Sequence, residues 1–313
     1  MALARFEPSN RRYFPDNQPF RVGFDPDGPW QMVPYRGDRH LHLAVTGVDG
    51  WTVESLNPNI AEVERIVQEG GVDQDKNNVF RVGGLHPGRT FVVARGPRRE
   101  LLAKIEIEVK LRLKRFIKFV FVSDNAGHRT TISEKDTREW TQFINEKVFE
   151  PQINVHFEYL GTGKIRINQD LGDRINFASI GDMPFVKRDD AAGRIWHEIT
   201  DAGTFNAACF NVFCVWDFVN PSNEGDENVA FVSSKDRITA AEMETSGQNF
   251  NMCMFREKVD GDWYHKYVLA HEAGHYLNRM PFHTTREDQL MTPGTAGTFL
   301  GKADAAKMNP TAG

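Results

Sequence analysis

The sequence predicts a two-domain protein, with an all-β sandwich over residues 17–110 and a domain of mixed sheet and helices over residues 112–313. Two observations support this division. Up to residue 110, short segments alternate apolar with polar side chains, as strands with one buried face do. Beyond residue 111, continuous apolar segments alternate with segments of helical period, which predicts buried strands connected by helices.

Composition excludes several classes of protein. With 313 residues, of which 40% are hydrophobic and 26% charged, the chain can bury a sizeable core and is neither disordered nor fibrous. Its formal net charge of -5 gives no support for nucleic-acid binding, which normally shows a basic excess. The three cysteines are too few for a disulfide scaffold. Whether Cys209 and Cys214 form a bridge stays open.

The expected strands of the first domain are short and are separated by turns. Turn residues occur at Asn-Pro-Asn (57–59) and at Leu-His-Pro-Gly (85–88). Many short alternating segments at this spacing predict a β-sandwich. We expect the strands at residues 19–24, 41–47, 52–56, 61–67, 78–84, 90–96 and 101–109.

Two stretches of this domain resemble the bacterial Ig-like domains of surface proteins and multidomain enzymes. They are NPNIAEV, from Asn57, and NVFRVGGLHPGRTFVVARG, from Asn78. In that family a Val-x-Gly-Leu strand end is followed by a Pro-Gly-x-Thr turn, as it is here. The resemblance implies a spacer or adhesion module without chemistry of its own, and a delivery or surface partner that binds through it. A β-sandwich of another lineage is the alternative.

The second domain is predicted to begin with a strand, a helix and a strand. Residues 114–124 form a continuous apolar strand, and residues 136–151 an amphipathic helix with Asp136 as N-cap and Pro151 at its end. Residues 153–160 form the next strand, and this order favours a right-handed crossover with a parallel pair. Later strands are expected at 210–219, 228–234 and 251–255, a helix at 263–278, and mostly loop over 161–208.

The chemistry is concentrated in the sequence His-Glu-Ala-Gly-His on the last of these helices. His271 and His275 are four residues apart, so both can present a ring nitrogen to one ion. Glu272 then lies beside that ion and can act as general base toward water. The apolar residues 267–270 predict a buried helix, and burying two unpaired imidazoles would be costly. His265 is expected on a different, exposed face.

A catalytic zinc needs a third protein ligand, which makes the following residues important. From His271 to Thr292 the chain resembles the metzincin clan of zinc peptidases, whose pattern is H-E-x-x-H-x-x-G-x-x-H followed by a methionine-containing turn beneath the zinc. Met291 resembles the methionine of that turn, and residues 297–308 resemble the C-terminal helix that packs behind it. The upstream order of strands and helix also resembles this clan, including an edge strand before the active-site helix.

Two positions depart from the pattern of that clan. Asn278 replaces the glycine, and asparagine is the next most tolerant residue for a left-handed helix exit. Pro281 replaces the third histidine and cannot ligate a metal. His283 follows two residues later, and we expect a longer excursion of the chain to deliver it as third ligand. Asp288 and Glu287 are rival ligands, and a solvent-facing His283 is the other alternative.

These features predict an endopeptidase with one catalytic Zn2+ held by His271, His275 and His283. Glu272 would take a proton from zinc-activated water and pass it to the leaving amine. A protein or peptide substrate would add as a strand beside residues 228–234. The alternative is a non-catalytic binding or adhesion protein with a relic peptidase fold, although such a protein has no need for Glu272. Cleavage specificity stays open because it depends on the loops in 161–208 and 279–296.

The sequence predicts no insertion into a membrane. Its longest apolar stretch, residues 209–219, is too short to span a bilayer and is interrupted by Asn211 and Asp217. The N-terminal residues contain no apolar segment typical of a cleavable leader. A toxin-like effector exported by another route, and therefore secreted or extracytoplasmic, is the expectation. A cytoplasmic location, the export route and the oligomeric state stay open.

Overall fold

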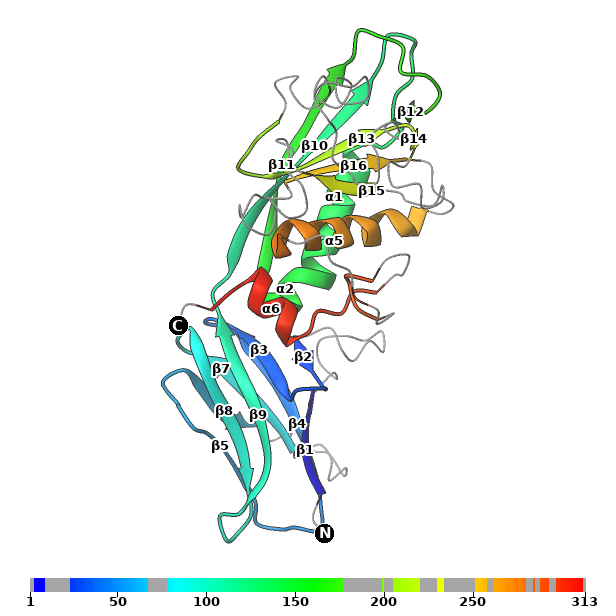
Figure 1. Cartoon of the computed structure of the whole chain (residues 1–313). Coiled ribbons are helices and arrows are strands. Elements are labelled where there is room, and N and C mark those ends of the chain that lie inside the picture. The colour runs from blue at the N-terminus through cyan, green and yellow to red at the C-terminus, as the bar shows by residue number, and fades with distance from the viewer. Residues whose placement is uncertain are drawn as a thin grey trace. The chain divides into compact units, whose positions relative to one another are not determined.

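Sheets make up most of the structure, and helices are few (Figure 1). The computed structural model describes residues 3–8, 23–66, 78–176, 199, 205–219, 230–233, 251–257, 262–279, 284, 288–292 and 297–311. The chain divides into two compact units. Unit 1 contains Met1–Leu113, Lys147–His156 and Phe299–Gly313, and unit 2 contains Lys114–Glu146 and Phe157–Thr298.

Two sheets form most of unit 1. The first has the strand order β1-β4-β7-β6 and is antiparallel throughout. The second has the order β2-β3-β9-β8-β5, in which β3 and β9 run parallel and the other pairs antiparallel. The bounds are β1 (Leu3–Pro8), β2 (Phe24–Asp25), β3 (Trp30–Pro34), β4 (Asp38–Thr46), β5 (Thr52–Ser55), β6 (Ala61–Arg65), β7 (Val79–Gly84), β8 (Gly88–Arg95) and β9 (Leu101–Lys110).

Apolar side chains from both sheets meet in one buried core. Strand β9 contributes alternate residues, because successive side chains of a strand point to opposite faces. The core residues of β9 are Ala103, Ile105, Ile107 and Val109, and those of β4 and β7 include Leu41, Leu43, Phe80 and Val82. The all-β, two-sheet character expected of this region is therefore present. The likeness to bacterial Ig-like domains stays a prediction.

Two strands of unit 1 were not expected from the sequence. Strand β1 lies before residue 17, where no strand was expected. It pairs with β4, which is more than thirty residues away, so the sequence around β1 does not indicate that it pairs. Strand β3 has four consecutive buried residues from Trp30 to Val33, and it therefore lacks the alternation of a half-buried strand. Of the strand expected at 19–24, residues 19–22 lie outside the described residues, and β2 begins at Phe24.

The C-terminal segment belongs to unit 1, which differs from the expected boundary at residues 110–112. Helix α6 (Lys302–Met308) is held to the sandwich at its first residue. The Lys302 backbone N–H donates to the Asp25 carboxylate at 2.9 Å, and its ammonium contacts Glu106 at 2.5 Å. Just before the helix, the Leu300 N–H donates to the Gln152 side chain at 2.9 Å. The peptidase-like domain expected over 112–313 therefore shares its C-terminal segment with the sandwich.

The buried ion pair of Lys110 and Glu108 binds the end of the C-terminal segment. The fully buried Lys110 ammonium donates to the Glu108 carboxylate at 3.1 Å and to the Asn309 carbonyl at 2.5 Å. The Thr311 hydroxyl donates to the same carboxylate at 2.5 Å. Burial raises the pKa of Glu108, but the hydrogen bond from Thr311 and the charge of Lys110 outweigh it and leave that pKa below its ordinary value. Burial also lowers the pKa of Lys110, although the charge of Glu108 acts in the opposite direction. Residues 309–311 complete the hydrogen bonding of the pair.

Replacing Lys110 with methionine should lower the free energy of unfolding of unit 1 by about 3–5 kcal/mol, because the Glu108 carboxylate would stay buried without its main cation. Urea denaturation followed by tryptophan fluorescence would measure the change. Adding Glu108→Gln to Lys110→Met should recover part of the loss, since no buried charge then remains. A Lys110→Met variant as stable as the wild type would contradict this role for the pair.

Unit 2 contains a five-stranded sheet of order β11-β10-β13-β16-β15. Strands β10, β13 and β16 run parallel, and β15 is antiparallel to β16 at the end of this order. A small parallel pair, β12 with β14, accompanies it. The bounds are β10 (Leu113–Ser123), β11 (Val155–Arg166), β12 (Ile175–Asn176), β13 (Phe210–Val215), β14 (Phe218–Val219), β15 (Ala230–Ser233) and β16 (Met252–Arg256).

The expected parallel pairing across the first crossover is confirmed by hydrogen bonds at both ends of β10 and β11. At their starts, the Leu113 N–H donates to the Asn154 carbonyl at 2.9 Å. At their ends, the Ile167 N–H donates to the Ser123 carbonyl at 2.8 Å. The two strands therefore run in the same direction, which requires a crossover connection such as the helical segment between them.

That connection differs from the expected helix at both ends. Helix α1 (Glu134–Phe143) has Ser133 as its N-cap, and Asp136 is the third helical residue of a capping box. Because serine and aspartate both suit an N-cap, the sequence alone does not choose between them. The helix continues as a π-helical segment, η2 (Ile144–Phe149), and then as α2 (Glu150–Ile153). Pro151 therefore does not end the helical segment, since it is the second residue of α2, where the π-helical segment gives way to α-helix.

Other expectations for unit 2 concern its loops and cysteines. Within 161–208, which was expected to be mostly loop, residues 161–166 extend β11 and 175–176 form β12, while 177–198 and 200–204 lie outside the described residues. Cys209, Cys214 and Cys253 are buried free thiols, so the bridge between the first two is absent.

No helix in the described part of the chain is long and apolar enough to cross a bilayer.

Candidate active site

Helix α5 (Asp262–Asn278) carries the His-Glu-Ala-Gly-His motif and packs against α1 and β15. His265 near its start is buried, contrary to the exposed position expected from its helix face. Its ring stacks on Trp140 of α1, with ring centroids 5.1 Å apart and planes at 11°. Its Nε2–H donates to the Glu257 carbonyl at 3.1 Å. The sequence could not show this burial, because the aromatic partner lies more than a hundred residues earlier.

The two histidines of the motif lie on the same side of α5. The ring centroids of His271 and His275 are 4.8 Å apart, with their planes at 82°. His275 is only 4% exposed, while His271 is partly buried. The separation of one helical turn thus brings both imidazoles together, as ligation of one ion requires.

A turn at residues 288–292 fixes the orientation of His271. The Leu290 carbonyl lies 2.7 Å from the His271 Nδ1. A carbonyl oxygen only accepts, so Nδ1 carries the proton and Nε2 keeps the lone pair with which a metal could be bound. In histidines that bind a metal through one ring nitrogen, the other ring nitrogen typically donates a hydrogen bond of this kind, which orients the ring. His271 therefore fits the chemistry of a zinc ligand.

The same turn brings Met291 against the motif. Met291 is buried, and a Cβ atom built on Gly274 would lie 2.5 Å from its sulfur. That approach is closer than van der Waals contact, so a side chain at residue 274 would require the Met291 side chain to shift from its present position. The structure thus places Met291 against Gly274, which lies between His271 and His275 in the sequence. Its role beneath a zinc ion stays a prediction.

Replacing Gly274 with alanine should destabilise the protein by about 1–3 kcal/mol through overpacking against Met291. In an ordinary helix interior the same substitution stabilises by roughly 0.5–1 kcal/mol, so the sign of the change is diagnostic. Thermal unfolding of the metal-free chain would measure it. In the Gly274→Ala/Met291→Ala double variant the added methyl group should cost less than in the wild-type background. Equal costs in the two backgrounds would contradict the contact.

Glu272 lies between the two histidines in the sequence and is buried in the helix packing. It is 6% exposed, and burial raises the pKa of its carboxyl to about 8. Its carboxylate is near Cys253 of β16, whose own pKa is raised by burial and further by the charge of Glu272. Burial thus favours the protonated form of this carboxyl in the metal-free chain, and a raised pKa of this kind is typical of carboxyl groups that act as general acid or base.

The segment after α5 bears on the third ligand. The helix ends at Asn278, but the left-handed exit is made by Arg279, with φ of 54°, and not by Asn278 as expected. Thr284 then lies beside the turn, where its N–H donates to the Met291 carbonyl at 2.9 Å. His283 itself lies outside the described residues, as do Pro281 and Glu287. Asp288 is described and exposed.

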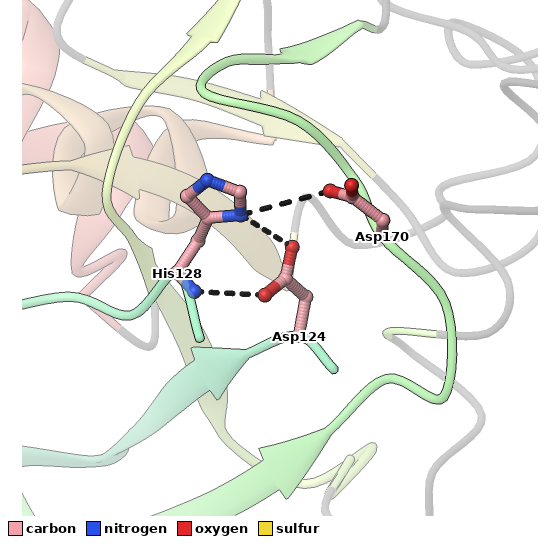
Figure 2. A group of neighbouring side chains, drawn as sticks. All are labelled: Asp124, His128 and Asp170. Atoms are coloured by element: carbon pink, nitrogen blue, oxygen red, sulfur yellow. Dashed lines mark hydrogen bonds and ion pairs between the residues drawn. The ribbon is translucent and has the colours of Figure 1, made fainter. Parts of the chain in front are cut away.

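A second group of ionisable residues was not found from the sequence. Asp124, His128 and Asp170 bring atoms of metal-ligand type within 4.8 Å of one another in unit 2 (Figure 2). Asp170 lies far along the chain from the other two, so no motif connects them. Hydrogen bonds and ion pairs connect these three side chains, such as the hydrogen bond between His128 Nδ1 and Asp124 at 2.7 Å. They give no support for zinc at this place.

Comparisons with known proteins identify no family. No family model matches the sequence, and no curated protein does. Solved structures show weak likeness: domains 4 and 5 of the S-layer protein SbsC align at 12% identity over 25% of this chain and 40% of that one, with a TM-score of 0.20. The C-terminal 282-residue fragment of intimin, in complex with the intimin-binding domain of its translocated receptor, aligns at 14% over 48% of each chain, with a TM-score of 0.21.

A sialyltransferase from Photobacterium damsela aligns at 7% identity over 60% of this chain and 42% of that one, with a TM-score of 0.20. The chain thus spans less than half the length of each of these structures. Scores this low establish neither a common fold nor a shared activity. A function for this chain must therefore be argued from its own residues.

Proposed function

We propose that the protein is a zinc-dependent endopeptidase that resembles the metzincins, with its active site on α5. One observation carries the proposal: the two imidazoles of His271 and His275 lie together on the helix while the turn containing Met291 packs directly against Gly274 between them. A helix with two incidental histidines has no need of a glycine fitted to a methionine from a later turn. The antiparallel edge strand β15 beside this helix supports the same reading.

The residues that would hold the metal are His271, His275 and His283. The hydrogen bond from His271 Nδ1 to Leu290 fits a ligand that binds through Nε2. His283 is proposed as the third ligand for its chemistry, and the N–H of the next residue, Thr284, donates to the Met291 carbonyl. When bound, Zn2+ would polarise the scissile carbonyl and lower the pKa of bound water.

Glu272 is the residue that would move the proton. Burial raises the pKa of Glu272 to about 8 in the metal-free chain. A bound Zn2+ would favour the ionised carboxylate, which could then accept a proton from water and later donate it to the leaving amine. A peptide substrate would be oriented by strand addition to β15, whose other side has no neighbour among the described strands. Backbone pairing of this kind favours an extended protein or peptide segment as substrate.

The test is metal analysis of the full chain together with a digestion assay on casein or unstructured peptides. We expect stoichiometric zinc, peptide cleavage that a chelator abolishes, and recovery of cleavage when zinc is added back. Zinc without any turnover would favour a binding protein that keeps a relic of the fold. Absence of zinc after purification under metal-replete conditions would show that the histidines of α5 are structural.

A further inference from the structure

Asp124 joins two segments at the end of strand β10 in unit 2. Its buried carboxylate accepts the His128 backbone N–H at 2.8 Å and the Leu171 backbone N–H at 3.0 Å. The first bond closes the turn 124–128, and the second attaches the segment 169–173 that follows β11. His128 Nδ1 also donates to Asp124, at 2.7 Å (Figure 2). One carboxylate therefore holds a turn, a neighbouring segment and an imidazole ring.

Both nitrogens of the His128 ring face carboxylates. Nδ1 is 2.7 Å from Asp124 and 3.7 Å from Asp170, and Nε2 is 3.3 Å from Asp173. An ionised carboxylate only accepts hydrogen bonds, and a neutral imidazole has a single N–H to give. All of these contacts are satisfied together only when the ring carries both protons. The arrangement therefore describes an imidazolium ion surrounded by three carboxylates.

The ring is also held on its face. It stacks on Trp216, which follows β13, with centroids 5.4 Å apart and planes at 22°. The Trp216 indole N–H donates to the Gly172 carbonyl at 3.1 Å, so the indole contacts the same segment 169–173. Two arginines of unit 2, Arg174 and Arg256, both contact Asp217. Among the residues that the structure describes, the titratable groups in contact with the His128 ring nitrogens are Asp124, Asp170 and Asp173.

We propose that protonated His128 latches the turn 124–128 to the segment 169–173, and that loss of its proton releases this end of the unit 2 sheet. The term His128 latch denotes these two segments with Trp216. The proposal does not depend on the peptidase activity, because none of its residues belongs to α5 or to the turn containing Met291. It gives the protein a conformational response to pH that is separate from catalysis.

The direction of the response follows from the pKa shifts. The hydrogen bond to Asp124 raises the pKa of His128, so its stabilisation is complete below the unfolded value of 6.5 and is lost as pH rises through the folded value. Burial raises the pKa of Asp124, but hydrogen bonds from His128 and Leu171 outweigh it and lower that pKa below 3.8. The contribution of Asp124 is therefore lost only in strong acid. The latch is closed in mild acid and opens toward alkaline pH.

Hydrogen exchange of the full chain, measured by mass spectrometry from pH 5.5 to pH 9 and corrected for intrinsic rates, tests the proposal. Protection of peptides covering 124–131 and 167–176 should fall by up to about tenfold per pH unit while His128 loses its proton. In His128→Gln, protection should be low throughout and should lack this dependence. His156→Gln, a histidine paired with Glu150 in unit 1, is the matched control and should keep the wild-type profile.

Asp173→Asn gives a second variant that does not endanger folding, since Asp173 is fully exposed. It should shift the loss of protection to lower pH, because the Nε2 proton loses its acceptor charge. Nitrogen-15 chemical shifts of the imidazole should show both ring nitrogens protonated at pH 6. A neutral ring at that pH, or the same exchange profile in wild type and His128→Gln, would overturn the latch. So would protection that disappears with a chelator and returns with Ca2+ or Zn2+, because a cation would then hold the group.

Discussion

Glu272→Gln should retain stoichiometric zinc and lose at least about 100-fold in the rate of peptide cleavage. Glutamine keeps the size of the side chain and its place in the helix packing, but it cannot accept a proton. Since Glu272 is proposed as base and not as ligand, the metal should be unaffected. Zinc content and turnover measured on the same preparation would separate the two roles. Turnover within a few-fold of wild type at full zinc would mean that another group is the base.

The same variant has an expected effect on stability in the metal-free chain. The folded pKa of Glu272, about 8, lies above its ordinary value of 4.5, so the unfolded state ionises first as pH rises. Stability therefore falls between these two values of pH, and glutamine should remove that fall. Glu139→Gln, an exposed glutamate of α1, is the control and should change neither activity nor this profile. A Glu272→Gln variant less stable than wild type at pH 7 would contradict the buried carboxyl.

The fold was predictable where its determinants are local. Alternation located most strands of the sandwich, and the helical period located α1 and α5 within a few residues. Strand β3 was not predicted, because it is buried on both faces and its sequence therefore does not alternate. The place of α6 also could not be predicted, because it depends on Lys110, Asp25 and Gln152, which lie far back in the chain. Local pattern thus identifies elements, whereas their partners depend on distant residues.

The candidate site divides in the same way. Spacing along one helix was enough to select His271, Glu272 and His275, and the structure brings the rings of His271 and His275 together as that spacing requires. The fit of Gly274 to Met291 was not predictable, since a glycine in a helix gives no indication of what approaches it. The His128 latch combines segments that are more than forty residues apart in the chain, and no short motif marks it.

The other large expected effect is on zinc affinity, and it concerns the identity of the third ligand. Two histidines alone hold zinc weakly, so the residue that completes the set should control affinity. His283 has the preferred chemistry, and the Thr284 N–H that follows it is bonded to the Met291 carbonyl. Asp288, the rival, lies at the exposed start of the turn, three residues before Met291. A carboxylate there would have to reach back toward α5 within a tight turn.

We therefore expect His283→Ala to weaken zinc binding by at least about 100-fold, since even the loss of a hydrogen bond behind a ligand costs 10- to 100-fold. Asp288→Ala should keep stoichiometric zinc, and it is the matched control from the same segment. Titration of both variants against a competing chelator gives the two affinities directly. Full-strength binding in His283→Ala together with loss in Asp288→Ala would transfer the role to the carboxylate. Full-strength binding in both would leave His271 and His275 with a ligand from elsewhere in the chain.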